Sequence, residues 1–163
     1  MNCNLVLIVL AACIGSIYCY PPTSDIQTSL HRFNNKTYYI ETLAKADFYR
    51  SFMFCQKINM RLVTVDSNEE FEKLVELIKK SVSFTHGAEV WTSATDLSVE
   101  GSFLWMSTGL PMNVDKWLPK EPNNAANSEH CMAFRNEGDT IGFNDNKCWT
   151  ENYFICESVP SQC

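Results

Sequence analysis

Oxygen-bearing side chains gather in two short stretches near the carboxyl end of the chain. The stretch EPNNAANSEHC contains Glu121, Asn123 and Glu129, and the stretch FNDNKC contains Asn144 and Asp145. Calcium takes about six to eight oxygen ligands and tolerates irregular geometry, so its ligands can come from separate loops. The two stretches therefore predict a calcium cage that leaves coordination positions open for a second ligand.

A simpler interpretation is that these residues only form turns, because Asn and Asp near Gly in residues 136–146 favour turns. An isolated EPN tripeptide also has little specificity as a motif. Here, however, a glutamate stands two residues before Cys131, and the Asn-Asp pair ends three residues before Cys148. This combined spacing favours the metal site.

Patterns typical of catalysis and of nucleic-acid binding are missing from the sequence. The histidines His31, His86 and His130 stand in unrelated contexts, and no HExxH, CxxC, GxSxG or glycine-rich phosphate loop is present. The net charge is −6, and no basic run is longer than two lysines, which argues against a nucleic-acid partner. We expect a binding protein rather than an enzyme, with His130 as a surface loop residue.

The first residues are typical of a secretory signal. Residues 1–19 carry no charged side chain and contain an apolar run from Leu5 to Ala12, which is too short to span a membrane. Pro21 and Pro22 follow and would end any helix. We therefore expect a secreted, extracellular protein without a membrane span, and a signal peptide over residues 1–19.

Secretion makes disulfides the expected state of the cysteines. After residue 19 the cysteines are Cys55, Cys131, Cys148, Cys156 and Cys163. The first four allow several pairings, and spacing does not choose among them. Cys163 is left over on a polar tail, where it either stays free or joins two chains into a disulfide-linked homodimer.

The first half of the chain predicts two helices between short strands. Residues 20–37 are expected to form a lead-in loop, whose Asn35 begins a glycosylation sequon of open occupancy. Strands are predicted over 38–40 and 61–65. Apolar residues at helical spacing predict a helix over 43–58 with Cys55 toward the core.

A second helix is predicted over residues 67–80. Ser67 and Glu70 have the spacing of a capping box, and Lys79-Lys80 complement the negative end of the helix dipole. Its apolar face consists of Phe71, Leu74, Val75 and Ile78.

After Gly87 no helical period returns, and short apolar segments between Gly, Pro, Asn and Asp predict strands and long loops. The chain is therefore predicted to be α+β. The segments are Val90-Trp91, Phe103-Leu104-Trp105, Lys116-Trp117-Leu118, Met132-Ala133-Phe134 and Tyr153-Phe154-Ile155.

These elements, together with WTSATDL, GSFLWMSTG, EPN, FND and FICE, resemble the C-type lectin domain over residues 38–158. Short secreted single-domain insect lectins are the most similar members. The resemblance implies a C-type lectin-like fold with two helices, antiparallel strands, long calcium-binding loops and two disulfides. Residues 159–163 would then be a tail.

The resemblance also implies roles for individual residues. It pairs Cys55 with Cys156 and Cys131 with Cys148, and it makes Pro122 a cis proline. The family's principal calcium site, which also holds the sugar, falls on Glu121, Asn123, Glu129, Asn144 and Asp145.

In the implied mechanism, two sugar hydroxyls bind the ion. They also accept hydrogen bonds from the amides of Asn123 or Asn144 and donate to Glu121 or Glu129. The order Glu-Pro-Asn implies mannose-type sugars, including GlcNAc and fucose.

The sequence departs from the family pattern in three ways. Phe143 replaces a tryptophan, and Ala94 replaces a glycine that relatives often carry. In the family's auxiliary calcium site, an amide and an imidazole replace two acids, so we expect that site to bind calcium weakly or not at all. The auxiliary site falls on Asp96, Glu100, Asn124, Glu129 and His130.

The sequence therefore predicts a secreted, calcium-dependent lectin for mannose-, fucose- or GlcNAc-containing glycans on cells or microbes, with glycan recognition or agglutination in innate immunity as its use. The alternative is a secreted protein-binding module of the same fold, for example in seminal fluid, in which sugar binding is incidental.

Overall fold

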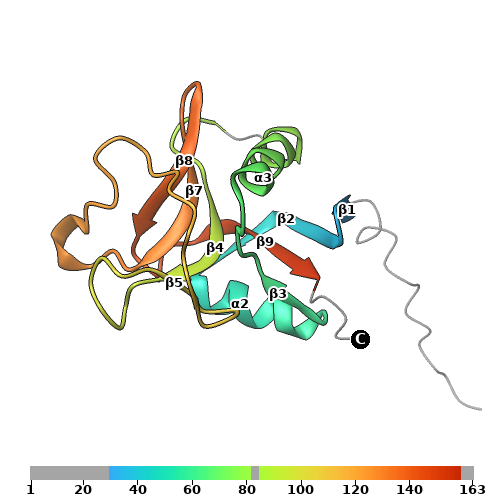
Figure 1. The fold of residues 1–163 in the computed structure, drawn as a ribbon, viewed down its shortest axis with the longest axis horizontal. Helices are drawn as coiled ribbons and strands as arrows, with labels where there is room; N and C mark the ends of the chain where they lie inside the picture. The colour runs from blue at the N-terminus through green and yellow to red at the C-terminus, as the bar shows by residue number, and fades with distance from the viewer. Residues whose placement is uncertain (1–29, 82–84, 159–163) are drawn as a thin grey trace, which may run out of the picture.

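The computed structural model describes residues 30–81 and 85–158, and it confirms the α+β class (Figure 1). Helices and strands alternate in the first half, and strands joined by long loops follow. In order, the elements are β1 (Leu30–Phe33), β2 (Lys36–Ala46), α2 (Phe48–Lys57), β3 (Met60–Leu62), α3 (Asn68–Ser81), β4 (Glu89–Thr95), β5 (Leu104–Trp105), β6 (Leu110–Pro111), the 3-10 helix η1 (Ala125–Asn127), β7 (Cys131–Glu137), β8 (Thr140–Asn146) and β9 (Asn152–Ser158).

Strand β4 joins two parts of the sheet. On one side it pairs with β9, which also pairs with β2 and β3. On the other side it pairs with β7, the first strand of the β7–β8 hairpin. The β4–β9 pair is parallel, so the sheet is mixed, whereas the sequence predicted only antiparallel strands. Through β4, the part of the fold that holds both helices supports the hairpin that carries Asn144 and Asp145.

The segment predicted to be a lead-in loop, residues 20–37, is partly a strand hairpin. Strand β1 lies inside it and pairs antiparallel with β2, and Asn35 is exposed in the turn between them. Lys36 attaches the hairpin to the domain, because its Nζ lies 2.8 Å from Glu70 and 3.0 Å from Glu157. These carboxylates lie far along the chain, so local patterns did not reveal the strand.

Helix α2 begins later than predicted, because Leu43 to Ala46 still belong to strand β2. Asp47 sets the boundary, since its carboxylate accepts a hydrogen bond from the backbone N–H of Arg50 at 2.8 Å. This bond satisfies one of the free donors in the first turn, so the helix starts at Phe48.

Helix α3 agrees with the predicted helix over residues 67–80. The hydroxyl of Ser67 accepts a hydrogen bond from the N–H of Glu70 at 3.1 Å. The other half of the predicted capping box is different, because Glu70 accepts from the N–H of Asp66 at 2.8 Å and from the hydroxyl of Tyr38 at 2.5 Å. The side chain of Glu70 is thus used to hold β2. The buried apolar residues of the helix are Phe71, Leu74 and Ile78.

Two disulfides tie these parts together, and they are the pairs that the resemblance implied. Cys55 on α2 joins Cys156 on β9, 101 residues away, and Cys131 joins Cys148, 17 residues away. In the chain-entropy model, closing loops of these lengths stabilises the fold by about 4.7 and about 3 kcal/mol. The first disulfide fastens α2 to the sheet, and the second joins the start of β7 to the residues that follow β8.

Phe143, the residue that replaces a tryptophan, is fully buried in β8. Its ring centroid lies 5.1 Å from that of Phe71 on α3 and 5.3 Å from that of Phe134 on β7. Trp117 packs against its other side at 6.0 Å. The replacement therefore keeps an aromatic contact between α3 and the β7–β8 hairpin.

Strand β8 was not predicted, because its sequence TIGFNDN consists mainly of residues that favour turns. It nevertheless pairs with β7 along its whole length. The segment 116–118, predicted as a strand, forms only an isolated bridge from Trp117 to Phe143. Cross-strand pairing and burial outweighed local propensity here.

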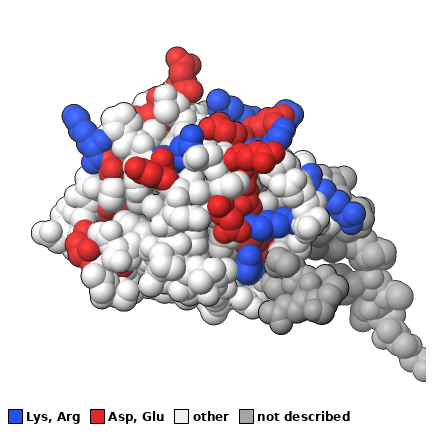
Figure 2. All heavy atoms as spheres, in the orientation of Figure 1, with Lys and Arg blue, Asp and Glu red and all other residues white. Residues whose placement is uncertain are grey.

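The surface drawn in Figure 2 mixes both signs of charge over α3. Lys73 and Lys80 each lie within 3.1 Å of Glu76, and Lys116 lies 3.2 Å from Glu72. Trp149 is 67% exposed.

No helix in residues 30–81 or 85–158 is both long and apolar enough to cross a membrane. The predicted signal peptide and Cys163 lie outside these described residues and stay predictions.

Gly142 on β8 provides a test of this packing. A Cβ at this position would lie 2.8 Å from the carbonyl oxygen of Lys116 and 2.9 Å from Cγ of Leu118. We expect Gly142→Ala to lower the free energy of unfolding by about 1–3 kcal/mol, measured by urea denaturation. Thr140→Ala, an exposed position on the same strand, is the control. Equal stability of the two variants would contradict the close approach.

Candidate functional site

The five predicted calcium ligands lie between the β7–β8 hairpin and the loop that precedes it. Asn144 and Asp145 belong to β8, and Asp145 stands opposite Met132 on β7. Glu121 and Glu129 lie in the preceding loop, and the Glu121–Pro122 peptide bond is cis. The structure therefore brings residues from both sequence stretches to one place.

Asp145 attaches the loop to the strand. Its carboxylate is almost fully buried and accepts two backbone hydrogen bonds, from the N–H of Asn123 at 3.0 Å and from the N–H of Asn124 at 2.7 Å. Two amides on one buried carboxylate fix the path of the loop directly after Pro122. The loop therefore presents Glu121 and Asn123 next to Asp145.

The other two carboxylates are partly exposed. Glu121 accepts a hydrogen bond from the side-chain amide of Asn123 at 2.5 Å. Glu129 accepts one from the N–H of Ala125 at 3.2 Å, and its own N–H donates to Oδ1 of Asn124 at 3.0 Å. These bonds fold residues 121–129 into a compact turn around the two carboxylates.

Burial and neighbouring negative charge raise the pKa values of the carboxyl groups at this place. Burial, a hydrogen bond with Asp145 and the negative charge of Asp145 raise the pKa of Glu121 from 4.5 to about 7. Burial and the charge of Asp145 also raise the pKa of Glu129. Carboxylates that repel one another in this way are stabilised by a cation between them. The donor set, three carboxylates with two amides, fits calcium, which prefers oxygen ligands.

Asn144 differs from its expected role as a donor to a sugar. It is 3% exposed, and its side-chain N–H groups donate to Glu89 at 3.1 Å and to the carbonyl oxygen of Asp145 at 2.6 Å. Both donors are thus used inside the protein. The amide left to face a sugar is that of Asn123, which is exposed.

Glu89 on β4 is a site residue that sequence reasoning missed. This buried carboxylate accepts from Asn144, from Asn146 and, at 3.1 Å, from Asn152. Burial raises its pKa, while its bonds to Asn146 and Asn152 and the charge of Arg135 act in the opposite direction. The available signal was an acid directly before the apolar pair Val90-Trp91.

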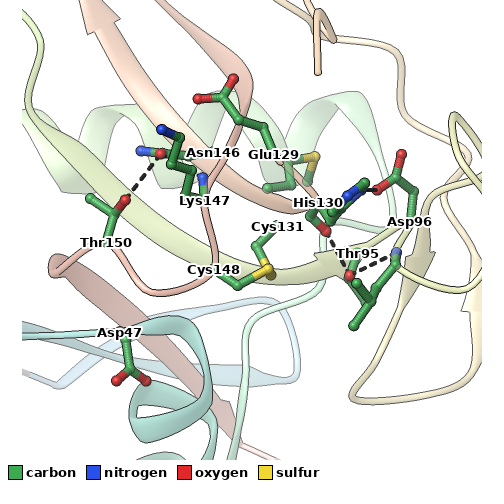
Figure 3. Close-up of a disulfide and its surroundings, with 12 residues drawn as sticks. Asp47, Thr95, Asp96, Glu129, His130, Cys131, Asn146, Lys147, Cys148 and Thr150 are labelled. Atoms are coloured by element: carbon green, nitrogen blue, oxygen red, sulfur yellow. Dashed lines mark hydrogen bonds and ion pairs between the residues drawn. A yellow bond between two sulfur atoms is a disulfide. The ribbon is translucent and has the colours of Figure 1, made fainter. Parts of the chain in front are cut away.

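The predicted auxiliary residues also come together. Nδ1 of His130 lies 3.1 Å from Oδ1 of Asp96 and 3.4 Å from Oε2 of Glu100. The amide of Asn124 donates to Oε2 of Glu100 at 2.6 Å. Figure 3 shows the imidazole directed at Asp96 beside the Cys131–Cys148 disulfide, while the carboxylate of Glu129 points elsewhere. The side chain of His130 is 25% exposed, so this loop residue stays partly at the surface while its ring contacts Asp96.

A family model described as the Lectin C-type domain matches residues 44–158. The chain belongs to this family. Among insect members, it is 28% identical over 135 residues to C-type lectin mosGCTL-7 of Aedes aegypti, covering 77% of this chain and 85% of that protein. Salivary C-type lectin 2 of Aedes albopictus is 33% identical over 108 residues, covering 64% of this chain and 72% of the relative. The likeness to short insect lectins is thereby confirmed.

Solved C-type lectin domains share the fold. The cow C-type carbohydrate-recognition domain of CD23, crystallised in the presence of a GlcNAc2Man3 oligosaccharide, is 29% identical with a TM-score of 0.67. The match covers 83% of this chain and 95% of that domain. The C-type lectin-like fold expected from the sequence is confirmed.

The contacts of Glu89 give a prediction about this C-type lectin domain. Glu89→Gln replaces one acceptor oxygen with an N–H donor that faces asparagine donors, so Asn144 loses its fixed orientation. Replacing a residue that orients a metal ligand typically lowers metal affinity about 10–100-fold. We expect calcium affinity to fall about tenfold, measured by isothermal titration calorimetry.

The matched control is Glu137→Gln, which changes an exposed carboxylate at the end of β7. It should leave calcium affinity unchanged. Near-UV circular dichroism must show both variants folded before their affinities are compared. A folded Glu89→Gln protein with unaltered calcium affinity would show that Glu89 does not orient Asn144.

Proposed function

We propose that this protein is a secreted lectin that binds carbohydrate through a calcium ion. The observation that carries the proposal is the convergence of three carboxylates and two amides around Asp145. Calcium would be held by Glu121, Asn123, Glu129, Asn144 and Asp145. When bound, it supplies an electrophile to which sugar hydroxyl oxygens coordinate.

These five residues differ in solvent exposure, and their proposed roles differ accordingly. Asn144 and Asp145 are buried and form the floor of the site. Glu121 and Glu129 are partly exposed and Asn123 is exposed, so these three face a ligand. The carboxylates of Glu121 and Glu129 accept hydrogen bonds from sugar hydroxyls, and the amide of Asn123 donates one to a hydroxyl oxygen. One vicinal hydroxyl pair would thus have each of its polar atoms satisfied.

The order Glu121-Pro122-Asn123 supports mannose-type specificity, including GlcNAc and fucose, as the resemblance implied. The solved CD23 domain was crystallised with an oligosaccharide of GlcNAc and mannose, which agrees with this ligand class. The ligands would be glycans on microbes or other cells, and their recognition in innate immunity is the proposed use. The disulfides support an extracellular location.

A glycan array with the folded protein, run in calcium and again in EDTA, tests this function. We expect mannose, fucose or GlcNAc signals in calcium that disappear in EDTA. Signals that persist in EDTA would contradict a role for calcium. Folded protein without signal in either buffer would favour the protein-binding alternative.

Asp145→Ala should abolish both calcium and sugar binding, at least about 100-fold, because it removes a ligand and also releases the loop after Pro122. The fold should survive, since both disulfides remain. Asp139→Ala, in the exposed turn between β7 and β8, is the control and should bind like the natural protein. Sugar binding by folded Asp145→Ala protein would refute the assigned site.

Calcium affinity should depend on pH, because its carboxylate ligands must be deprotonated. With the pKa of Glu121 at about 7, protons compete with the ion at neutral pH. We expect affinity to fall by up to about tenfold per pH unit below 7 for this one proton, measured by titration calorimetry from pH 8 to pH 5. Constant affinity over that range would contradict the prediction.

The stability of calcium-free protein should change in the opposite direction. Folded Glu121 binds its proton more tightly than unfolded Glu121, since folding raises its pKa from 4.5 to about 7. Its contribution to stability is therefore lost as pH rises through this window. Urea denaturation in EDTA should show this slope, and Glu121→Gln should flatten it.

A further inference from the structure

The cluster of Asp96, Glu100 and His130 has donors of a different kind from those around Asp145. One atom from each residue, an imidazole nitrogen and two carboxylate oxygens, lies within 4.8 Å of the others. Imidazole nitrogen suits zinc and other transition metals, whereas calcium prefers oxygen ligands. The cluster therefore offers a mixed nitrogen and oxygen set within one molecule.

The distances in the cluster fit a small ion. Zinc binds nitrogen and oxygen at about 2.0–2.2 Å in tetrahedral sites, which places neighbouring ligand atoms about 3.3–3.6 Å apart. Nδ1 of His130 lies 3.1 Å from the oxygen of Asp96 and 3.4 Å from that of Glu100. These two distances are close to those between neighbouring ligands of a tetrahedral zinc ion.

Calcium does not fit the same place. The amide of Asn124 turns its nitrogen, not its oxygen, toward Glu100, at 2.6 Å. Its oxygen already accepts a hydrogen bond from the N–H of Glu129 at 3.0 Å. With an imidazole in place of a further acid, too few free oxygens remain for the six to eight that calcium takes.

Two of the donors are held rigidly. Asp96 is 2% exposed, and its second oxygen accepts a hydrogen bond from the N–H of Gly101 at 2.7 Å. The carbonyl of His130 accepts from the hydroxyl of Thr95 at 2.6 Å and from the N–H of Asp96 at 3.2 Å (Figure 3). Glu100 is 57% exposed, so it closes the site from the solvent side, where water can complete the coordination.

We propose that Asp96, Glu100 and His130 form a zinc site that replaces the auxiliary calcium site of the family. The ion would fix Glu100, whose Oε2 also accepts the hydrogen bond from Asn124. Asn124 in turn donates its N–H to Asp145 at 2.7 Å. Zinc would therefore hold the loop that carries Glu121 in place without contacting a sugar.

The test is a zinc titration of the secreted protein by calorimetry, in buffer stripped of calcium and with its free cysteines blocked by iodoacetamide. We expect one zinc ion per chain, bound at least about tenfold more weakly by His130→Asn and by Glu100→Gln. The matched control is His86→Asn, which removes an exposed histidine 3.3 Å from Glu137 and should bind zinc like the natural protein. Equal zinc binding by all four proteins, or none by the natural protein, would overturn the site.

Two further measurements complete the test. Excess calcium should not displace the zinc. If calcium instead displaced zinc with an affinity equal to that of zinc, the cluster would be a calcium site. Zinc should also slow tryptic cleavage after Lys120, read by mass spectrometry, in the natural protein but not in His130→Asn. The same rate of cleavage with and without bound zinc would refute the effect on the loop. None of these measurements uses a sugar, and the zinc titration and the cleavage assay are run without calcium, so their outcome is distinguishable from that of the lectin proposal.

Discussion

The carboxylate of Asp145 is the constraint on which the site depends. It belongs to a strand, yet it satisfies two backbone amides of a loop more than twenty residues earlier in the chain. A buried carboxylate is costly unless its oxygens are hydrogen-bonded, so these two bonds hold the loop against the strand. Burial, together with the charge of Asp145, raises the pKa of Glu121 and of Glu129. One residue thus contributes both to the shape of the candidate site and to its electrostatics.

The rest of the fold keeps that strand in position. Among the strands in the described part of the chain, β8 pairs with β7 alone, and β7 joins the hairpin to β4, so β8 needs support from other elements. Phe143 supplies this support through its ring contacts with Phe71 and Phe134. The Cys131–Cys148 disulfide closes the hairpin at the end next to the site. The scaffold therefore braces β8 next to the candidate site, and a proposed binding site needs such rigid support.

Buried polar groups organise the surroundings of the site. Glu89 accepts hydrogen bonds from three asparagine amides, one of which is that of Asn144. Asn124 donates hydrogen bonds to both Glu100 and Asp145. Through Asn124, these bonds connect two groups of side chains that differ in the atoms they could offer to a metal ion. The set around Asp145 consists of oxygens alone, whereas the set around His130 contains a nitrogen. Because their donor atoms differ, the two sets prefer different cations.

Local sequence patterns determined the α+β class, the helix that begins after Ser67 and the membership of Glu121 and Asp145 in one site. These features rest on helical periodicity, on a cap and on the spacing of acids from cysteines, all of which lie within short stretches of chain. Only the tertiary structure showed that TIGFNDN forms a strand along its whole length and that Glu89 supports Asn144, and local patterns did not bring His130 to Asp96, which the family resemblance alone implied. Glu89 and Asn144 are 55 residues apart, and His130 and Asp96 are 34 apart. No local pattern encodes such pairs, because they form only when β4 has packed beside the β7–β8 hairpin.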